Sequence, residues 1–288
     1  MRLDEEYRQC VVLIGTARVG KAKVGEIDPW GTGFLVSDSN VHSAYLVTAA
    51  HVVSDNLDAP FDVRFNKRAG GADLLHVDEP EWFLHQTDNT VDVAVHLIEI
   101  PDWAACTQIP RSPNLTEKER FRRKNIGAGN RTYTVGLFKF LHGDRRNQPF
   151  VYSGHIGLVP EDQPIPVKSW LKAHRDRVLV EAYLVEGEPL DGASGSPVFV
   201  RRTLGPSAFP RVKAQFWVEG SIWLLGLLSD AFRGKPGSDY DIPGGGMIPR
   251  GVNVVVPASK IMEVMDHPTL KERREAAQQR SNKAERPT

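Results

Sequence analysis

Short apolar segments separated by turn-forming residues constrain the fold of this sequence more than any other feature. The segments are of strand length, are rich in β-branched and aromatic residues, and are divided by Gly, Pro, Asn and Asp. They do not alternate regularly with long helical stretches. The pattern predicts an all-β protein whose antiparallel strands form a barrel or a sandwich. We expect strands within 10–14, 34–36, 45–47, 62–65, 91–100, 133–138, 151–159, 178–185, 197–200, 216–228 and 252–256.

A polar segment divides these strands into two similar series. Residues 110–130 are rich in Pro, Lys, Arg and Glu and offer no apolar face to bury, which is typical of an exposed connector. The sequence therefore predicts an N-terminal β-domain over 8–110, a connector over 111–130 and a C-terminal β-domain over 131–267. A chain of 288 residues is long enough to give each domain a core.

The end of the sequence predicts a helix that docks on the second domain. Pro257 suits the first turn of a helix, and four apolar residues then fall on one helical face: Ile261, Met262, Val264 and Met265. Residues 268–288 are almost wholly polar, so we expect a frayed helix or a charged, disordered tail there.

The composition argues against several classes of function. Lys plus Arg and Asp plus Glu number 36 each, so no net field attracts nucleic acid or an anionic membrane. Cys10 and Cys106 lie apart, which predicts two buried, reduced thiols rather than a disulfide framework or a zinc site. The charged N-terminus lacks the apolar core of a secretory signal, and no segment stays apolar for membrane-spanning length. We therefore expect a cytoplasmic protein without a metal, a cofactor, a nucleic-acid partner or a membrane partner.

The segment Gly-Ala-Ser-Gly-Ser-Pro at 192–197 is the strongest chemical signal. Small residues around Ser194 permit a tight turn that lifts the hydroxyl outward and frees backbone N–H groups. Those of Gly192 and Ser194 can converge on one point and stabilise the oxyanion of a tetrahedral intermediate. An ordinary turn between two strands is the alternative, because short motifs often match by chance.

A serine nucleophile needs a base, and the base needs a carboxylate to orient it. His51 follows an apolar strand in the segment Thr-Ala-Ala-His-Val-Val, whereas His96 lies in the middle of a strand pattern and is more simply a strand-face residue. Asp92 lies within Val-Asp-Val-Ala-Val, where a carboxylate is costly to bury without a partner. Asp88 competes with it but lies in a Thr-Asp-Asn-Thr turn, where aspartate is common. His51 and Asp92 are therefore the candidate partners of Ser194.

Together these segments resemble the trypsin-like serine proteases of the chymotrypsin fold, and in style the bacterial high-temperature-requirement protease domain. Gly-Thr-Gly-Phe-Leu-Val at 31–36 resembles the strand that enters the family's first barrel, and His, Asp and Ser follow in the family's order. The nucleophile segment resembles Gly-Asn-Ser-Gly-Gly-Pro, from which Ala193 and Ser196 depart. Two later segments resemble the strand that pairs with the substrate backbone and the closing strand: 226–229 and 251–256.

The resemblance implies two six-stranded antiparallel barrels, with the active site between them, and endopeptidase activity on protein or peptide substrates. His51 is then the base that accepts the Ser194 proton, and Asp92 holds the imidazole. The oxyanion hole is formed by the N–H groups of Gly192 and Ser194. Ser196 corresponds to a small residue in the family and is implied to be dispensable. No PDZ-like module fits in the remaining C-terminal segment, so regulation would come from a partner protein.

Substrate selection is less defined by the sequence. The residue six before the nucleophile commonly lies at the base of the family's primary specificity pocket, and here it is Glu188, which can pair with a substrate Arg or Lys. Glu188 is alternatively an exposed loop residue. Ser229 is implied to lie on the substrate-binding strand, and Ala231 stands near a position where many members have glycine and can narrow the pocket. Ala193 replaces the aspartate that receives the freed N-terminus in zymogen-derived members, so activation by N-terminal cleavage is not expected.

Two other functions are compatible with this fold. A non-catalytic binding module would normally have lost one of His51, Asp92 or Ser194, and all three are present. An esterase would use the same nucleophile, but the order of the three residues differs from that of the α/β-hydrolases.

Overall fold

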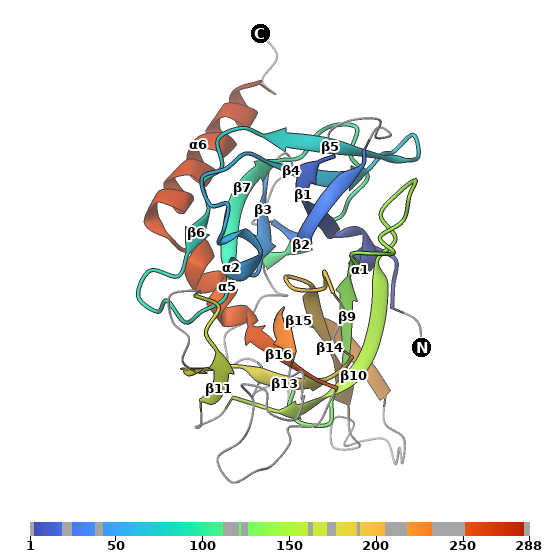
Figure 1. Ribbon diagram of the computed structural model, residues 1–288, viewed down its shortest axis with the longest axis vertical. Coiled ribbons are helices and arrows are strands. Elements are labelled where there is room, and N and C mark those ends of the chain that lie inside the picture. The colour runs from blue at the N-terminus through green and yellow to red at the C-terminus, as the bar shows by residue number, and fades with distance from the viewer. Residues whose placement is uncertain are drawn as a thin grey trace.

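Two β-sheet units lie one above the other along the long axis of the molecule (Figure 1). The first half of the chain, blue to cyan in Figure 1, forms the upper unit, and the second half, green to orange, forms the lower one. The computed structural model describes residues 3–18, 25–37, 43–111, 121, 126–160, 164–171, 177–188, 191–204, 218–231 and 251–284.

In the described part of the chain, the upper unit is an eight-stranded sheet in the order β5-β4-β1-β2-β3-β7-β6, with β8 paired to β2. All neighbours are antiparallel except β8, which runs parallel to β2. The strands are β1 (Val11–Ala17), β2 (Ile27–Ser37), β3 (Ser43–Thr48), β4 (Phe61–Asn66), β5 (Ala72–Val77), β6 (Phe83–Leu84), β7 (Ala94–Glu99) and β8 (Ile109–Pro110). A short helix, α1 (Glu6–Gln9), precedes β1.

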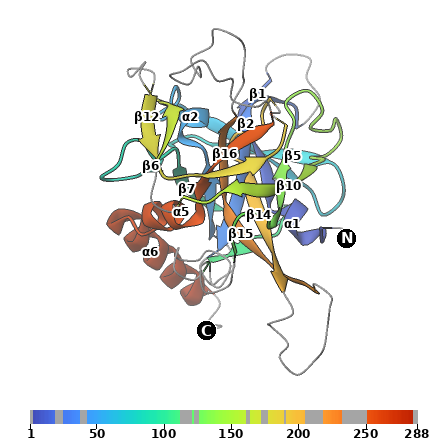
Figure 2. The ribbon, with the colours of Figure 1, turned by 90° about the horizontal axis from the view of Figure 1, so that it is seen from below.

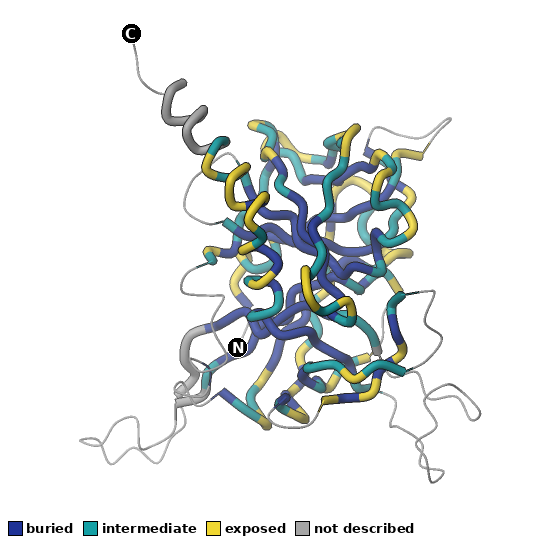
Figure 3. Tube along the Cα trace, turned by 90° about the vertical axis from the view of Figure 1, so that its left-hand side faces the viewer, coloured by how far each residue is buried: buried dark blue, intermediate teal, exposed yellow. Residues whose placement is uncertain are grey.

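Strands β1 and β3 are buried on both faces over most of their length, which explains their apolar runs. Alternate residues of a strand point to opposite faces of a sheet. Val12 and Ile14 of β1 therefore enter one core with Phe61 of β4, while Val11 and Leu13 enter a second core. That second core also takes side chains from the lower unit and from a C-terminal helix, so it joins the parts of the molecule. In Figure 3 the buried trace runs through both units and across their junction.

The lower unit is a closed barrel in the order β10-β13-β16-β15-β14-β9. Its strands are β9 (Arg131–Gly136), β10 (Phe150–Leu158), β13 (Tyr183–Glu186), β14 (Pro197–Leu204), β15 (Val218–Ala231) and β16 (Val252–Pro257). Inward residues such as Ile156, Val198 and Leu225 form its core.

The predicted all-β fold with a C-terminal helix is confirmed. The lower unit has the expected six strands, and the upper unit has six longer strands extended by β6 and β8, which are only two residues long each. The region expected to form one strand over 178–185 is split between two sheets. Its first part belongs to a separate hairpin, β11 (Ile165–Lys168) with β12 (Arg177–Val180), which projects beside the barrel (Figure 2).

The C-terminal segment forms two helices. Helix α5 (Ala258–Met265) docks as predicted, with Ile261, Val264 and Met265 buried. Residues 268–284, for which we expected a frayed helix or a disordered tail, form helix α6 (Pro268–Ala284), which runs alongside the upper unit in Figure 1. The helix has almost no apolar stripe, but Leu270 is fully buried and the Arg274 guanidinium donates a 2.9 Å hydrogen bond to the Tyr45 hydroxyl.

Most of the predicted connector, 111–130, lies outside the described residues. Cys10 and Cys106 are both free, but only Cys10 is buried, whereas we expected both to be. Burial raises the pKa of both thiols, to about 11 for Cys106. Among the helices of the described segments, none combines the length and the apolar character needed to cross a bilayer.

Candidate active site

His51 lies on a one-turn helix, α2 (Ala50–Val53), which follows β3 directly. Its neighbours Ala50, Val52 and Val53 are buried, so the short helix is fixed by its apolar side chains. The His51 side chain is 32% exposed. Helix α2 lies at the edge of the upper unit nearest the barrel (Figure 1).

Asp92 lies just before β7 and is bound to His51 by two hydrogen bonds. Its Oδ2 is 2.7 Å from His51 Nδ1, and its Oδ1 accepts a 2.9 Å hydrogen bond from the His51 backbone N–H. The Ser229 hydroxyl, from β15, donates to Oδ2 at 2.5 Å. The Asp92 side chain is only 5% exposed, and these three donors compensate for the burial of its charge.

The two side chains shift each other's pKa. Burial alone would lower the pKa of His51, but the charge of Asp92 and the hydrogen bond to it outweigh burial and raise that pKa. Burial alone would raise the pKa of Asp92, but the charge and hydrogen bonds of His51, with that of Ser229, lower it. Asp92 is therefore ionised, and His51 is a stronger base than a free imidazole.

The competing residues use their polar atoms elsewhere. The Asp88 carboxylate accepts hydrogen bonds from the backbone N–H and hydroxyl of Thr90, at 3.0 and 2.6 Å, and so closes its own turn. His96 is buried in the upper unit, where its Nδ1 lies 2.9 Å from the Glu81 carbonyl oxygen.

The nucleophile loop, residues 191–196, depends on two glycines with positive φ. Gly192 and Gly195 have φ of 89° and 85°, which L side chains rarely adopt. A Cβ on Gly195 would also lie 2.1 Å from the Thr32 carbonyl oxygen, and one on Gly192 would lie 2.9 Å from the Lys139 nitrogen. The glycines therefore let this loop lie directly against backbone on two sides.

Thr32 of β2 anchors the nucleophile loop to the upper unit. Its N–H donates to the Ser194 carbonyl oxygen at 3.0 Å, and its hydroxyl donates to the Gly192 carbonyl oxygen at 2.7 Å. From the barrel side, the N–H of Gly195 donates to the Leu228 carbonyl oxygen at 2.8 Å. Our sequence reading missed Thr32 as a site residue. The sequence feature that could have identified Thr32 is a polar side chain between two glycines, followed by the apolar residues 34–36.

Ser194 is half-buried in this loop. Within the described segments, no hydrogen bond joins its hydroxyl to His51, as is common in unliganded catalytic sites, where such bonds are long and tighten on binding. The N–H groups of Gly192 and Ser194 donate to no other described residue, whereas the N–H of Ser196 donates to the Ala193 carbonyl oxygen. The Ser196 hydroxyl is buried without a described partner.

The proposed specificity residues occupy different settings. Glu188 is exposed after the end of β13, and its charge raises the pKa of Tyr152, in addition to the effect of burial. Ser229 contacts Asp92 directly. Ala231 ends β15, and the residues that follow it, 232–250, lie outside the described segments.

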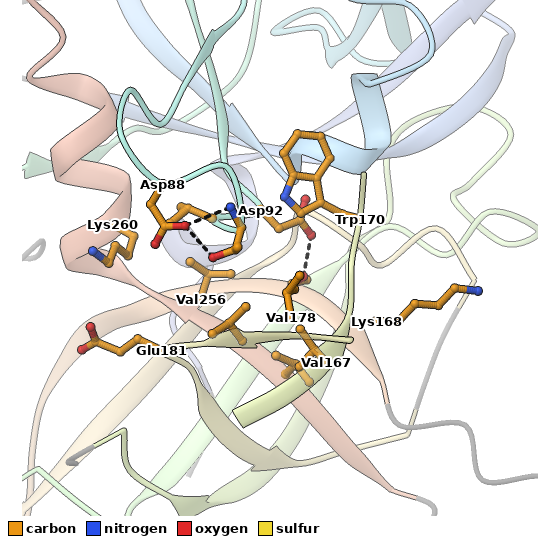
Figure 4. Close-up of a pocket in the computed structure, with 14 residues that line it drawn as sticks. Asp88, Asp92, Val167, Lys168, Trp170, Val178, Glu181, Val256 and Lys260 are labelled. Carbon is orange, nitrogen blue, oxygen red and sulfur yellow. Dashed lines mark hydrogen bonds between the residues drawn. The ribbon is translucent and has the colours of Figure 1, made fainter. Parts of the chain in front are cut away.

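A pocket of about 80 Å³ lies beside Asp92 and Ser229, against the hairpin of β11 and β12 (Figure 4). Its wall is about half apolar and half polar, and the charged ends of Lys168, Glu181 and Lys260 point outward. The apolar lining residues are Val91, Val167, Trp170, Val178, Val180, Val254 and Val256. In the described part of the chain, no group of three or more His, Cys, Asp or Glu side chains could hold a metal ion.

A family model described as a trypsin-like peptidase domain matches residues 31–203 of this sequence. The chain belongs to the trypsin-like peptidase family. The matched span begins at the strand that carries Thr32 and includes His51, Asp92 and Ser194. No curated protein sequence matches the chain.

One solved structure places the trypsin-like chain in the chymotrypsin fold. Human heparin binding protein superimposes with a TM-score of 0.50 at 12% identity, covering 93% of this chain and 96% of that one. The Rv3671c protease from M. tuberculosis, in its active form, gives a TM-score of 0.44 at 16% identity, covering 90% of this chain and 80% of that one.

Proposed function

We propose that this trypsin-like protein is a serine endopeptidase with His51, Asp92 and Ser194 as its catalytic triad. The observation that carries the proposal is the pairing of His51 with a buried, ionised Asp92. Thr32 and Leu228 support it, because they hold the loop of Ser194 by its backbone and leave its hydroxyl free.

His51 accepts the Ser194 proton as the hydroxyl attacks the scissile carbonyl, and returns that proton to the leaving amine. Asp92 holds the imidazole with Nδ1 protonated, so that Nε2 is the basic nitrogen, and it stabilises the imidazolium that forms. The N–H groups of Gly192 and Ser194 serve as the oxyanion hole, since they have no acceptor among the described residues. Water then hydrolyses the acyl-enzyme by the same steps.

The substrates are proteins or peptides. Ser229 ends the part of β15 that we assign to pairing with the substrate backbone, in addition to its hydrogen bond to Asp92. A regulatory partner would act by ordering the loop around 187–192, because that loop carries the Gly192 N–H, the proposed oxyanion donor.

Glu188 is the candidate that would select Arg or Lys before the scissile bond. Its carboxylate lies near Gly251, at the point where the chain enters β16. Changing Glu188 to Gln should weaken cleavage after Arg and Lys selectively, as measured on a peptide library. Cleavage after apolar or small residues in the unaltered enzyme would leave Glu188 as an exposed loop residue.

A catalytically silent binding module is the second candidate, since one protein of the same fold is named for binding heparin. A fluorophosphonate probe separates the two. The proposal expects stoichiometric labelling that is lost in Ser194→Ala, whereas a binding module is not labelled. Cleavage of a peptide library then separates a peptidase from an esterase.

A further inference from the structure

Arg64 is the largest fully buried side chain of the described residues, and it lies in the middle of β4, with 2% of its surface exposed. Burying a charge is costly unless hydrogen bonds replace its hydration. The Arg64 guanidinium donates three: Nη1 to the Gly143 carbonyl oxygen at 2.9 Å and to Asn147 Oδ1 at 3.0 Å, and Nη2 to the Asp144 carbonyl oxygen at 3.0 Å. All three acceptors belong to the loop that joins β9 to β10 in the lower unit.

Asn147 completes a cage around Arg64. Its Nδ2 donates to the Arg64 carbonyl oxygen at 2.7 Å, and its backbone N–H donates to Asn66 Oδ1 at 2.7 Å. Asn66 Nδ2 in turn donates to the Asn147 carbonyl oxygen at 3.2 Å. Six hydrogen bonds thus join β4 of the upper unit to residues 143–147.

The other end of this loop lies directly behind the candidate oxyanion hole. The N–H of Lys139 donates to the Asp191 carbonyl oxygen at 2.9 Å. The N–H of Leu137 donates to the Thr32 hydroxyl oxygen at 3.0 Å. Gly192 lies so close to Lys139 that even a Cβ would collide with it. The position of the 137–149 loop therefore sets the position of the Asp191–Gly192 backbone.

Polar contacts, not apolar burial, hold the tip of the loop. Phe140 and Leu141 are 70% and 75% exposed, so burial of their side chains does not hold the loop in place. Within the loop, the Gln148 N–H donates to the His142 carbonyl oxygen at 2.8 Å, and His142 Nδ1 lies 2.9 Å from the Lys139 carbonyl oxygen. These contacts connect the end held by Arg64 to the end that supports Gly192.

We propose that Arg64 is a positioning residue for the oxyanion hole. Its cage with Asn66 and Asn147 fixes the 137–149 loop, and the loop fixes the backbone that presents the Gly192 N–H. This inference rests on the proposed serine endopeptidase function.

The test compares Arg64→Met and Asn147→Ala with Arg18→Met. Arg18 is a suitable control because its ion pair with Asp28 is exposed and contributes little. We expect kcat and the rate of fluorophosphonate labelling to fall about ten- to a hundredfold in both cage variants, since small misplacements of a catalytic group have effects of this size. KM should stay within about twofold, because substrate binding is not altered. The double variant should be little worse than Arg64→Met, since both changes remove one cage.

Hydrogen exchange provides a readout that is independent of activity. In both cage variants, exchange should become faster in 137–149 and in 188–195, but not in the control. If Arg64→Met does not fold, Asn147→Ala carries the test alone, because it opens the cage from the loop side. Wild-type labelling rates together with unchanged exchange in 188–195 would overturn the inference. If the wild-type protein is not labelled at all, the proposed function fails, and exchange in 188–195 alone decides whether Arg64 positions this loop.

Discussion

Asp92 accepts three hydrogen bonds, and each constrains a different part of the site. The two from His51 fix both the backbone and the ring of the base, and the one from Ser229 ties the carboxylate to the barrel. The pair was predictable from sequence because a carboxylate inside an apolar strand demands a partner. The hydrogen bond from Ser229 to Asp92 could not be predicted from the sequence, since the two residues are 137 positions apart and no local pattern marks the contact.

Ser194→Ala should abolish peptide cleavage and leave the fold intact, because it removes one half-buried hydroxyl. The loss should be at least about a thousandfold, and His51→Ala should match it, with no further loss in the double variant, since triad members act as a unit. Ser196→Ala is the control. Its hydroxyl is buried without a described partner, so its removal should preserve both activity and stability. Loss of activity in Ser196→Ala with retention in Ser194→Ala would reverse the assignment.

The raised pKa of His51 predicts the pH dependence of cleavage. His51 must be neutral to accept the Ser194 proton, so kcat/KM should rise with pH and level off only above the ordinary imidazole pKa of about 6.5. In Asp92→Asn the raising charge is lost, so the acid limb should move to lower pH while kcat falls about 10⁴-fold. Measuring kcat/KM of the wild-type protein and of Asp92→Asn between about pH 5 and 9 tests both expectations. An acid limb that stays in place in Asp92→Asn would remove Asp92 from the site.

At the scale of elements, the site depends on a strand from one unit that binds a loop of the other. Thr32 on β2 contacts both Gly192 and Leu137 through its hydroxyl. Element type was largely predictable, because most strands contain short apolar or β-branched segments bounded by turn-forming residues. The break between β12 and β13 was missed, since their apolar residues are nearly continuous in sequence and only the separate pairing of β12 with β11 distinguishes them.

Thr32→Val should weaken both folding and catalysis. It leaves the Leu137 N–H and the Gly192 carbonyl oxygen without their buried partner, which should lower the free energy of unfolding by about 2 kcal/mol and slow fluorophosphonate labelling. Thr132→Val is a matched control, because the Thr132 hydroxyl is buried without a described partner. Urea unfolding measures the first effect and labelling kinetics the second. Equal results for the two variants would show that the Thr32 hydroxyl does not support the loop.

At the scale of the whole molecule, contacts far apart in sequence assemble the site. The two-unit arrangement follows from two series of strands, and the order of His51, Asp92 and Ser194 along the chain places them on both units. The Arg64 cage was not predicted, because β4 alternates apolar with polar residues and Arg64 falls among the polar ones, where a solvent-facing side chain is the simpler reading. For helix α6 the sequence left a frayed helix and a disordered tail open, because the segment has almost no apolar stripe.

The N-terminal segment also packs into this assembly, which bears on whether the proposed activity needs N-terminal cleavage. Leu3 is buried, the ring of Tyr7 lies 5.0 Å from that of Phe199 in an edge-on contact, and Cys10 is buried. Ala193, the residue before the nucleophile, is itself buried and has no charge to receive a freed ammonium group. Trimming back to Cys10 would therefore remove packing contacts and create no compensating ion pair.

We predict that the protein comprising residues 1–288 is active without N-terminal cleavage. A protein that carries an N-terminal tag should cleave peptides, with mass spectrometry confirming that the tag remains. A variant that begins near Cys10 should be no more active, and it should unfold at lower urea concentration because the contact between Tyr7 and Phe199 is lost. An inactive tagged protein that gains activity only after trimming would show that a new N-terminus orders the oxyanion loop. Activity of the tagged protein would mean that contacts already present in the folded chain order that loop.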